Sequence, residues 1–177
     1  MRHDPVVIAD YSAEWPRAFE SEAQGLRRIF APERVQIEHV GSTAVPGMGA
    51  KPIVDILLGA SSLRAIERCI PRLAADSYEY VPQFEAVLPL RRYFSKPSRA
   101  NAVFHLHAVE VGGDFWREQL AFRDVLRSER RLFDEYLALK RALAARYTND
   151  VDAYCDAKAP FIQSVLRERL SRDAVRG

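Results

Sequence analysis

The fold is decided by one continuous stretch, Ile37-Glu38-His39-Val40-Gly41-Ser42-Thr43-Ala44-Val45-Pro46-Gly47-Met48-Gly49-Ala50-Lys51-Pro52-Ile53-Val54-Asp55-Ile56-Leu57-Leu58. An apolar run that begins at Val35 ends at Gly41, and a second run of β-branched and aliphatic residues covers Ile53 to Leu58. Runs of this kind, bounded by glycine and proline, are typical of strands. The stretch therefore predicts two strands joined by a turn of small residues.

The turn between these strands carries groups that suit an anion. Gly41 allows the backbone to turn tightly, and Ser42 and Thr43 add two hydroxyls beside the amides of the turn. Lys51 can bring a positive charge to the same place. The sequence therefore predicts that these four residues bind phosphate or another anion.

Asp55 is the polar residue within the second apolar run. Carboxylates are rarely buried unless they are paired, capped or bound to a metal. Two interpretations follow, a strand-end carboxylate that caps a neighbouring loop or a member of a functional site. Asp55 taken alone does not decide between them.

Gly41-Ser42 followed by a strand carboxylate at Asp55 resembles the signature of the nucleotidyltransferase superfamily. In that superfamily Gly-Ser holds the nucleotide phosphates and strand carboxylates hold magnesium. More narrowly, His39 to Gly47 together with Lys51 to Ile56 resembles the GrpB family, a branch sometimes attached to dephospho-coenzyme A kinase domains. The resemblance extends over nearly the whole chain, through the segments Asp10 to Pro16, Phe104 to Glu110, Phe122 to Arg127, Tyr136 to Lys140 and Tyr154 to Lys158.

One position departs from the superfamily pattern. Active nucleotidyltransferases usually carry a second carboxylate two residues after the first, because strand alternation then places both on one face. This chain has Leu57 at that position. A two-metal phosphoryl-transfer site needs several oxygen ligands close together, so one expected ligand is missing.

Length and composition set the outer limits. With 177 residues, 48% of them hydrophobic, the chain suits a single domain over residues 1–177 with a helical C-terminal layer over 113–177. The net charge of +2 is small, so we expect a nucleotide or other small phosphate-containing ligand rather than duplex nucleic acid. We expect Cys69 and Cys155 to be small buried residues. No uncharged run reaches the ~20 residues that a membrane helix requires. We expect a cytoplasmic protein, whose oligomeric state the sequence leaves unknown.

The order of elements predicts an α+β fold. Helices are expected from Ser12 to Ala31 and after Ser62, with an interruption at Pro71. Further strand candidates are Val6 to Ile8, Tyr78 to Val81, Ala86 to Leu90 and Val103 to Val111. The resemblance implies a nucleotidyltransferase-like mixed sheet with helices packed on one side and a helical C-terminal layer.

His105 and His107 are two residues apart on the last of these strands and therefore share a face. Such a pair often presents metal ligands, and imidazole suits zinc or other transition metals. The alternative is one core histidine beside one exposed histidine. Because the resemblance places this strand beside that of Asp55, it implies a Mg²⁺ or Zn²⁺ site made by Asp55, His105 and His107, with His39 nearby.

Four more cationic residues are candidates for binding phosphate. Arg92 and Lys96 lie in a mixed basic and aromatic segment, which either contacts the ligand or protects a solvated strand edge. Lys140 and Lys158 interrupt apolar helix faces, so they either extend to water or reach the ligand. The resemblance favours contact with the ligand. We expect Pro160 to break or kink the last helix and so to leave Lys158 at a helix end.

Three functions remain open. The resemblance implies an enzyme that transfers a nucleotidyl or phosphoryl group to a small acceptor, in which Asp55 binds the divalent metal and His107 completes its shell or acts as a base. The first alternative is a catalytically inactive nucleotide-binding or anion-binding module linked to coenzyme A or nucleotide metabolism. The second is a metal-dependent hydrolase centred on Asp55 and the histidines. Leu57 counts against the transferase.

Overall fold

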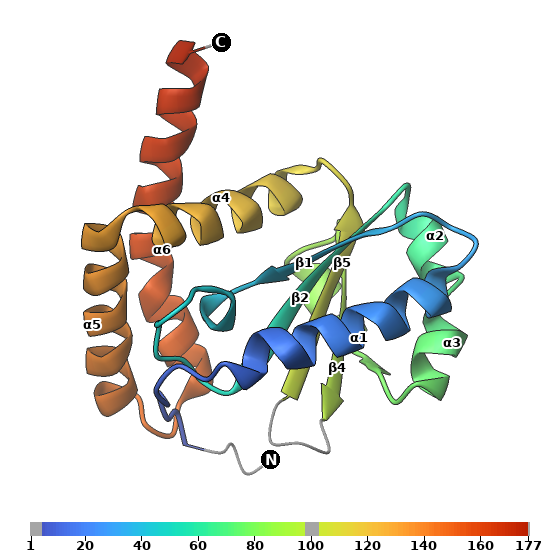
Figure 1. Cartoon of the computed structure of the whole chain (residues 1–177), viewed down its shortest axis with the longest axis horizontal. Helices are drawn as coiled ribbons and strands as arrows, with labels where there is room; N and C mark the ends of the chain where they lie inside the picture. Colours follow the sequence, from blue (N-terminus) through green and yellow to red (C-terminus); the bar gives the residue numbers. More distant parts are fainter. Residues whose placement is uncertain (1–4, 98–102, 177) are drawn as a thin grey trace.

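A five-stranded mixed sheet forms the centre of the computed structural model, which describes residues 5–97 and 103–176 (Figure 1). The strands are β1 (Gln36–Val40), β2 (Ile53–Ala60), β3 (Glu79–Tyr80), β4 (Arg91–Pro97) and β5 (Val103–Glu110). Their order across the sheet is β1-β2-β5-β4-β3. The central pair, β2 and β5, is parallel, and the other neighbours are antiparallel. The predicted mixed α+β sheet is therefore confirmed.

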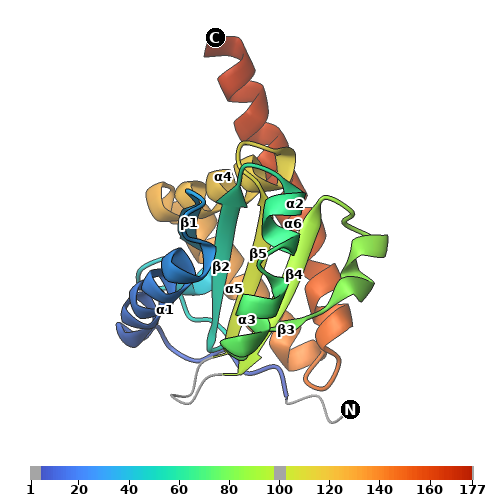
Figure 2. The ribbon, with the colours of Figure 1, turned by 90° about the vertical axis from the view of Figure 1, so that its right-hand side faces the viewer.

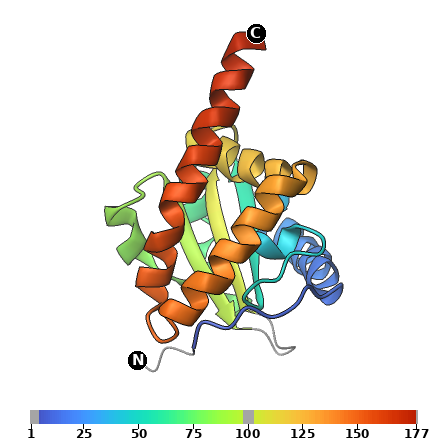
Figure 3. The ribbon, with the colours of Figure 1, turned by 90° about the vertical axis from the view of Figure 1, so that its left-hand side faces the viewer.

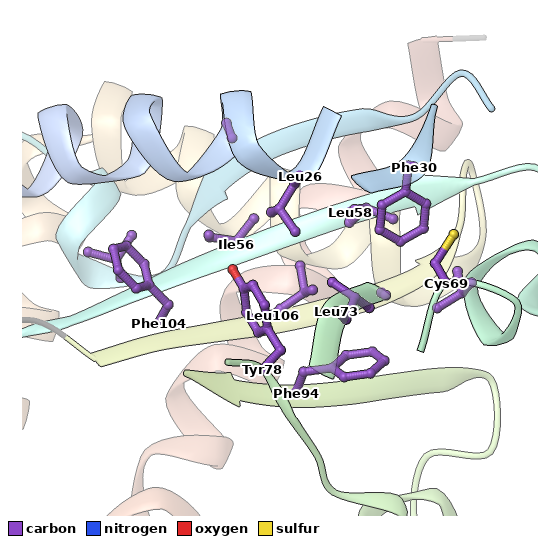
Figure 4. Close-up of a cluster of buried hydrophobic side chains, with 14 of the residues drawn as sticks. Leu26, Phe30, Ile56, Leu58, Cys69, Leu73, Tyr78, Phe94, Phe104 and Leu106 are labelled. Atoms are coloured by element: carbon purple, nitrogen blue, oxygen red, sulfur yellow. The ribbon is translucent and has the colours of Figure 1, made fainter. Parts of the chain in front are cut away.

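One face of the sheet is covered by α1 (Glu14–Phe30), α2 (Leu63–Glu67) and α3 (Ile70–Ala75) (Figure 2). Strand alternation points Ile56 and Leu58 of β2 to this face, where they meet Leu26 and Phe30 of α1 (Figure 4). These four side chains are fully buried. Burying a side chain of this size stabilises the fold by about 1.5–3 kcal/mol, so this layer anchors β2.

The opposite face is covered by the C-terminal helices, α4 (Asp114–Ser128), α5 (Arg130–Arg146) and α6 (Val151–Arg176) (Figure 3). This is the helical C-terminal layer that the sequence predicts. The far end of α6 projects beyond the sheet (Figure 1). Among the described residues, no helix combines the length and apolar character needed to cross a bilayer.

Two predicted strands are wrong. Instead of a strand at Val6 to Ile8, a single bridge pairs Ala9 with Ala50. Ala86 is the last residue of the 3-10 helix η2 (Pro82–Ala86), and residues 87–90 lie outside the sheet, which resumes at Arg91. Pro89 explains the second error, because proline lacks the N–H that a strand ladder requires.

The helix ends follow the predicted capping in part. α1 begins at Glu14, whose N–H is 3.2 Å from the hydroxyl of Ser12. Ser62 caps α2, and the expected interruption near Pro71 is the break between α2 and α3. Of the predicted break or kink at Pro160, a break is excluded, since α6 continues through Pro160, and Lys158 therefore lies within the helix and not at its end.

Candidate functional site

A cavity of about 820 Å³ lies between the sheet face that carries Asp55 and the helices α5 and α6. The sheet side contributes Asp55, Arg91, Tyr93, His105 and His107. The turn after β1 and the loop before β2 contribute Ser42, Thr43 and Lys51, and the helices contribute Lys140, Tyr154, Cys155 and Lys158. The fold thus brings most of the sequence-predicted residues to one space. Cys155 is exposed rather than buried as predicted, whereas Cys69 is buried.

Gly41 brings the turn against the carboxylate of Asp55. Its φ of +71° favours glycine, and an ideal Cβ at this position would lie 2.3 Å from Oδ2 of Asp55. Any larger residue would displace the carboxylate or the turn. The 3-10 helix η1 (Ser42–Ala44) follows at once, so Ser42 is positioned by the same contact.

The hydroxyl of Thr43 is used within the protein. It donates to the carbonyl of Ile53 at 2.9 Å and lies 3.0 Å from Nε2 of His39. Because its hydrogen is already donated, the hydroxyl accepts the Nε2–H of His39. Thr43 is only 1% exposed, so its hydroxyl ties the turn to the start of β2 and does not serve as the predicted phosphate donor.

His39 lies on the other face of the sheet from Asp55. It pairs with Ile56 in the strand register, stacks on Phe19 of α1 with ring centres 4.8 Å apart, and is 7% exposed. Burial lowers the pKa of His39 to about 4, against the opposing effect of Asp55. The prediction that His39 joins the metal site is therefore wrong.

Asp55 lies beside both predicted histidines. Its Oδ1 is 3.4 Å from Nε2 of His107 and 3.6 Å from Nδ1 of His105. Burial acts to raise the pKa of Asp55, but hydrogen bonds from the two histidines outweigh it and hold that pKa well below its usual range. Burial also lowers the pKa of His107. A charged carboxylate therefore faces a neutral imidazole.

These groups do not fit a zinc centre. Among the described residues, no group of three or more His, Cys, Asp or Glu side chains has the arrangement to hold a metal ion. Nδ1 of His107 is 3.1 Å from Nη1 of Arg91, a group that only donates, so the ring proton sits on Nε2, facing Asp55. Leu57 is fully buried with Val40 and Trp116, which leaves no second strand carboxylate.

Three lysines line the same cavity, namely Lys51, Lys140 and Lys158. Nζ of Lys140 donates to Oγ of Ser42 at 2.9 Å and to the carbonyl of Gly49 at 2.6 Å. Nζ of Lys158 lies 4.3 Å from the ring centre of Tyr154, and Nζ of Lys51 lies 5.7 Å from the same centre. In the described part of the chain, none of these ammonium groups forms an ion pair with a carboxylate.

Lys140 is 2% exposed, although it interrupts an apolar helix face. Burial lowers its pKa to about 7, with further lowering by the nearby charges of Lys158 and Arg141. Burial likewise lowers the pKa of Lys158. Cations held so close together without carboxylate partners favour an anion among them.

Arg92 and Lys96 lie away from the cavity. Arg92 pairs with Glu67 at 2.7 Å and Glu85 at 3.2 Å, and Lys96 pairs with Glu22 at 2.7 Å and Asp76 at 2.8 Å. Alternation along β4 turns both toward α1–α3, so the prediction that they face the ligand is wrong.

The same alternation turns Arg91 and Tyr93 into the cavity, and the sequence reading missed both. Tyr93 pairs with His107 in the register of β4 and β5, and its ring centre lies 5.3–5.4 Å from those of His105 and His107. Only this register shows which residues of the basic and aromatic segment face the site. Arg91 and Tyr93 could have been found by predicting a strand from Arg91 to Lys96 and pairing it with the strand of His105 and His107.

Two arginines of α4 hold the turn from outside the cavity. Nε and Nη2 of Arg127 donate to the carbonyl of Ala44 at 3.0 and 2.7 Å. Nη1 of Arg123 donates to Glu38 at 2.7 Å and to the carbonyl of His39 at 3.1 Å. They fix the turn to α4, a role that the sequence did not predict, although both lie in the segment Phe122 to Arg127 that carries the family resemblance.

The mixed sheet, the glycine-serine turn against a strand carboxylate and the C-terminal helical layer make up a nucleotidyltransferase-like fold. A structure of the Cid1 poly(U) polymerase bound to Mg 3′-dATP superposes with a TM-score of 0.55, covering 84% of this chain and 49% of that chain. At 13% sequence identity, this likeness shows the shared fold alone.

Comparisons with more similar proteins identify the family. The family described as GrpB protein matches residues 5–168. The glutamate-rich protein GrpB of Alkalihalophilus pseudofirmus is 34% identical over 92% of this chain and 95% of its own length. The crystal structure of GrpB from Enterococcus faecalis superposes with a TM-score of 0.83 at 30% identity, covering 94% of this chain and 98% of that chain. The chain belongs to the GrpB family, as the sequence predicts.

Some relatives are much longer than this chain. UPF0157 protein YqkA of Bacillus subtilis is 34% identical over 90% of the chain, which spans 46% of YqkA. A protein named dephospho-CoA kinase in Mycolicibacterium paratuberculosis is 27% identical over 92% of the chain, which again spans 46% of that protein. The predicted link to dephospho-coenzyme A kinases is thus confirmed as a sequence relationship.

The contact between Gly41 and Asp55 predicts a difference between two glycines of the same loop. Gly41→Ala and Gly47→Ala both place an alanine at positive φ, which costs about 1–2 kcal/mol. A Cβ at Gly47 finds Phe133 at 3.9 Å, whereas one at Gly41 meets Asp55. We expect Gly41→Ala to lower the free energy of unfolding by at least ~1 kcal/mol more, as measured by urea titration. Equal losses would mean that the carboxylate does not constrain the turn.

The buried His39 predicts a loss of stability in acid. Its pKa falls from 6.5 to about 4 on folding, so the unfolded chain binds the proton more readily and the free energy of unfolding falls as pH drops through this window. The shift corresponds to about 3 kcal/mol. His39→Gln retains an N–H donor for Thr43 without titrating, so we expect most of this decline to disappear. Urea unfolding of both proteins across the window measures it, and the same decline in the variant would exclude His39 as its source.

Proposed function

We propose that this protein binds a phosphate-bearing small molecule of the nucleotide class in the cavity between the sheet and α6. The observation that carries the proposal is the presence of Lys51, Lys140 and Lys158 together with Ser42 in the lining of one cavity. Among the described residues, no carboxylate forms an ion pair with any of these three ammonium groups. The phosphates of a ligand would supply that charge.

The charge of the cavity lining supports an anionic ligand. Four cationic side chains line the cavity, Lys51, Arg91, Lys140 and Lys158, against three carboxylates, Asp55, Asp152 and Asp156. Lys140 strengthens this argument, because a bound phosphate would raise its lowered pKa and hold it in the charged form. The lysines can then bind the phosphates of the ligand without a metal.

The size and the aromatic lining support a nucleotide over a simple phosphate. A cavity of about 820 Å³ falls within the range of about 300–1,000 Å³ that is typical of small-molecule sites. Phe84, Tyr93 and Tyr154 line the cavity, and the ring centres of Phe84 and Tyr93 are 5.0 Å apart. Aromatic side chains of this kind stack bases. A ligand that carries both phosphates and a ring system fits both features.

Nucleotidyl or phosphoryl transfer to a small acceptor is the second candidate function. The favouring observation is the ionised state of Asp55 in the cavity lining. Mg²⁺ is often held by one or two carboxylates together with substrate phosphates, so Asp55 is the residue that would hold it when the ligand binds. Leu57 removes the second carboxylate, which favours binding without turnover. A hydrolase centred on the histidines has no metal-binding group in the described residues to support it.

Thermal unfolding against nucleotides, coenzyme A precursors and simple phosphates tests the binding proposal. A ligand present at a hundred times its dissociation constant stabilises the folded state by about 2.7 kcal/mol, which such a scan detects. We expect a nucleotide or coenzyme A precursor to raise the Tm in the presence of EDTA. A shift that requires Mg²⁺, together with product formation that Asp55→Ala abolishes, would favour the transferase. No shift with any compound would contradict the proposed function.

Two lysine variants locate the binding site once a ligand is found. Lys158→Gln removes a charge from the cavity, and Lys96→Gln removes one that pairs with Glu22 and Asp76 on the other face. We expect Lys158→Gln to weaken binding at least tenfold, about 1.4 kcal/mol, and Lys96→Gln to leave it unchanged, as measured by calorimetry. Equal affinities in the two variants would place the ligand elsewhere.

A further inference from the structure

Arg91 reaches the Asp55 cluster through one nitrogen of His107. Its Nη1 lies 3.1 Å from Nδ1 of that ring. A guanidinium has donors and no acceptor, so Nδ1 must be the acceptor in this contact. In the neutral ring the single proton then sits on Nε2, which lies 3.4 Å from Oδ1 of Asp55. Hydrogen bonds thus run in one direction, from Arg91 through His107 to Asp55.

Aromatic rings from three elements hold the guanidinium of Arg91 in this place. Its Cζ lies 5.3 Å from the ring centre of Tyr93 on β4, 5.5 Å from that of Phe115 on α4 and 5.7 Å from that of Phe84 on η2. Its Nε is buried with no hydrogen-bond partner among the described residues. The position of Arg91 is therefore fixed by ring contacts and by His107 rather than by a carboxylate.

The spacing of the cluster lies close to that of a metal site. Oδ1 of Asp55 is 3.4 Å from Nε2 of His107 and 3.6 Å from Nδ1 of His105. Neighbouring ligands of a tetrahedral zinc, each about 2.0–2.1 Å from the metal, lie about 3.4 Å apart. A zinc ion at these atoms would require the side chains to move, because in the described structure they are not arranged to hold a metal. The proton on Nε2 opposes this, because a metal needs the lone pair of that nitrogen.

We propose that Arg91 is a positioning residue that fixes His107 in its Nε2–H tautomer, so that transition metals are kept out of the Asp55–His105–His107 cluster and Asp55 remains a hydrogen-bond acceptor. His107 is then a donor to Asp55 and not the metal ligand that its sequence spacing predicts. The proposal deepens the proposed function by explaining why binding needs no metal at the histidines. Its test uses no nucleotide, so either proposal can fail while the other stands.

Three variants distinguish the effect of the hydrogen-bond donor of Arg91 from the effect of the rest of its side chain. Arg91→Met keeps an unbranched apolar chain among the three rings and removes the donor to Nδ1. Arg91→Lys retains a donor of similar reach. Arg92→Met is the matched control, since Arg92 is the next residue of β4 and pairs with Glu67 and Glu85 on the opposite face.

The first measurement is the protonation state of the His107 nitrogens, observed by ¹H–¹⁵N correlation NMR of the metal-free protein at neutral pH. We expect the Nε2–H tautomer in the wild type, Arg91→Lys and Arg92→Met, and a population of the Nδ1–H tautomer in Arg91→Met. A wild-type ring with its proton on Nδ1 would overturn the proposal. This readout needs only the wild-type protein, so the proposal stays testable if Arg91→Met fails to fold.

The second measurement is a calorimetric titration of the same proteins with Zn²⁺. We expect Arg91→Met to bind zinc at least tenfold more tightly than the wild type, and Arg91→Lys and Arg92→Met to match the wild type. Adding His105→Ala to Arg91→Met should abolish the gain if the zinc sits in the cluster. Equal zinc affinity in the wild type and Arg91→Met, or a gain that survives His105→Ala, would overturn the proposal.

Discussion

The close approach of Gly41 to the carboxylate of Asp55 is the constraint on which the rest of the site depends. It joins the turn after β1 to the middle of the sheet, at a distance that leaves no room for a Cβ. Ser42 follows in the chain and receives the hydrogen bond of Lys140 from α5. Turn, sheet and C-terminal helices are therefore fixed relative to one another around one carboxylate, and the cavity lies where they meet.

Because side chains alternate along each strand, one face of the sheet packs in the core and the other carries the site. On β2, Val54, Ile56 and Leu58 pack under the first helical layer, while Asp55 points to the cavity and Leu57 to the apolar contact with α4. Leu57 thus occupies the position of a second carboxylate and uses it for packing. Because Leu57 packs against apolar side chains and offers no oxygen ligand, binding is favoured over two-metal catalysis.

Local patterns predicted the turn and the strands around Asp55, whereas the family resemblance was needed to bring the paired histidines and the two helix lysines to the same place. Ser42, Asp55, both histidines and both lysines do line one cavity. The errors concern which face of the sheet a side chain lies on and which strand it pairs with. The sequence of a single strand reveals neither. The resemblance implied that His39 lies near the site, yet alternation along β1 turns it to the other face. Arg92 and Lys96 were preferred over Arg91 for lack of the register between β4 and β5.

The central claim is that phosphates bind among Lys51, Lys140 and Lys158 without a metal cluster at Asp55. The most direct measurement is a crystal structure of the protein with a bound nucleotide, grown with Mg²⁺ present and examined for anomalous signal after replacement by Mn²⁺. We predict phosphates within hydrogen-bond distance of Lys140 or Lys158 and the Ser42 turn, with at most one ion, held by the phosphates. Two metal ions on Asp55 and the histidines, or a nucleotide outside the cavity, would contradict it.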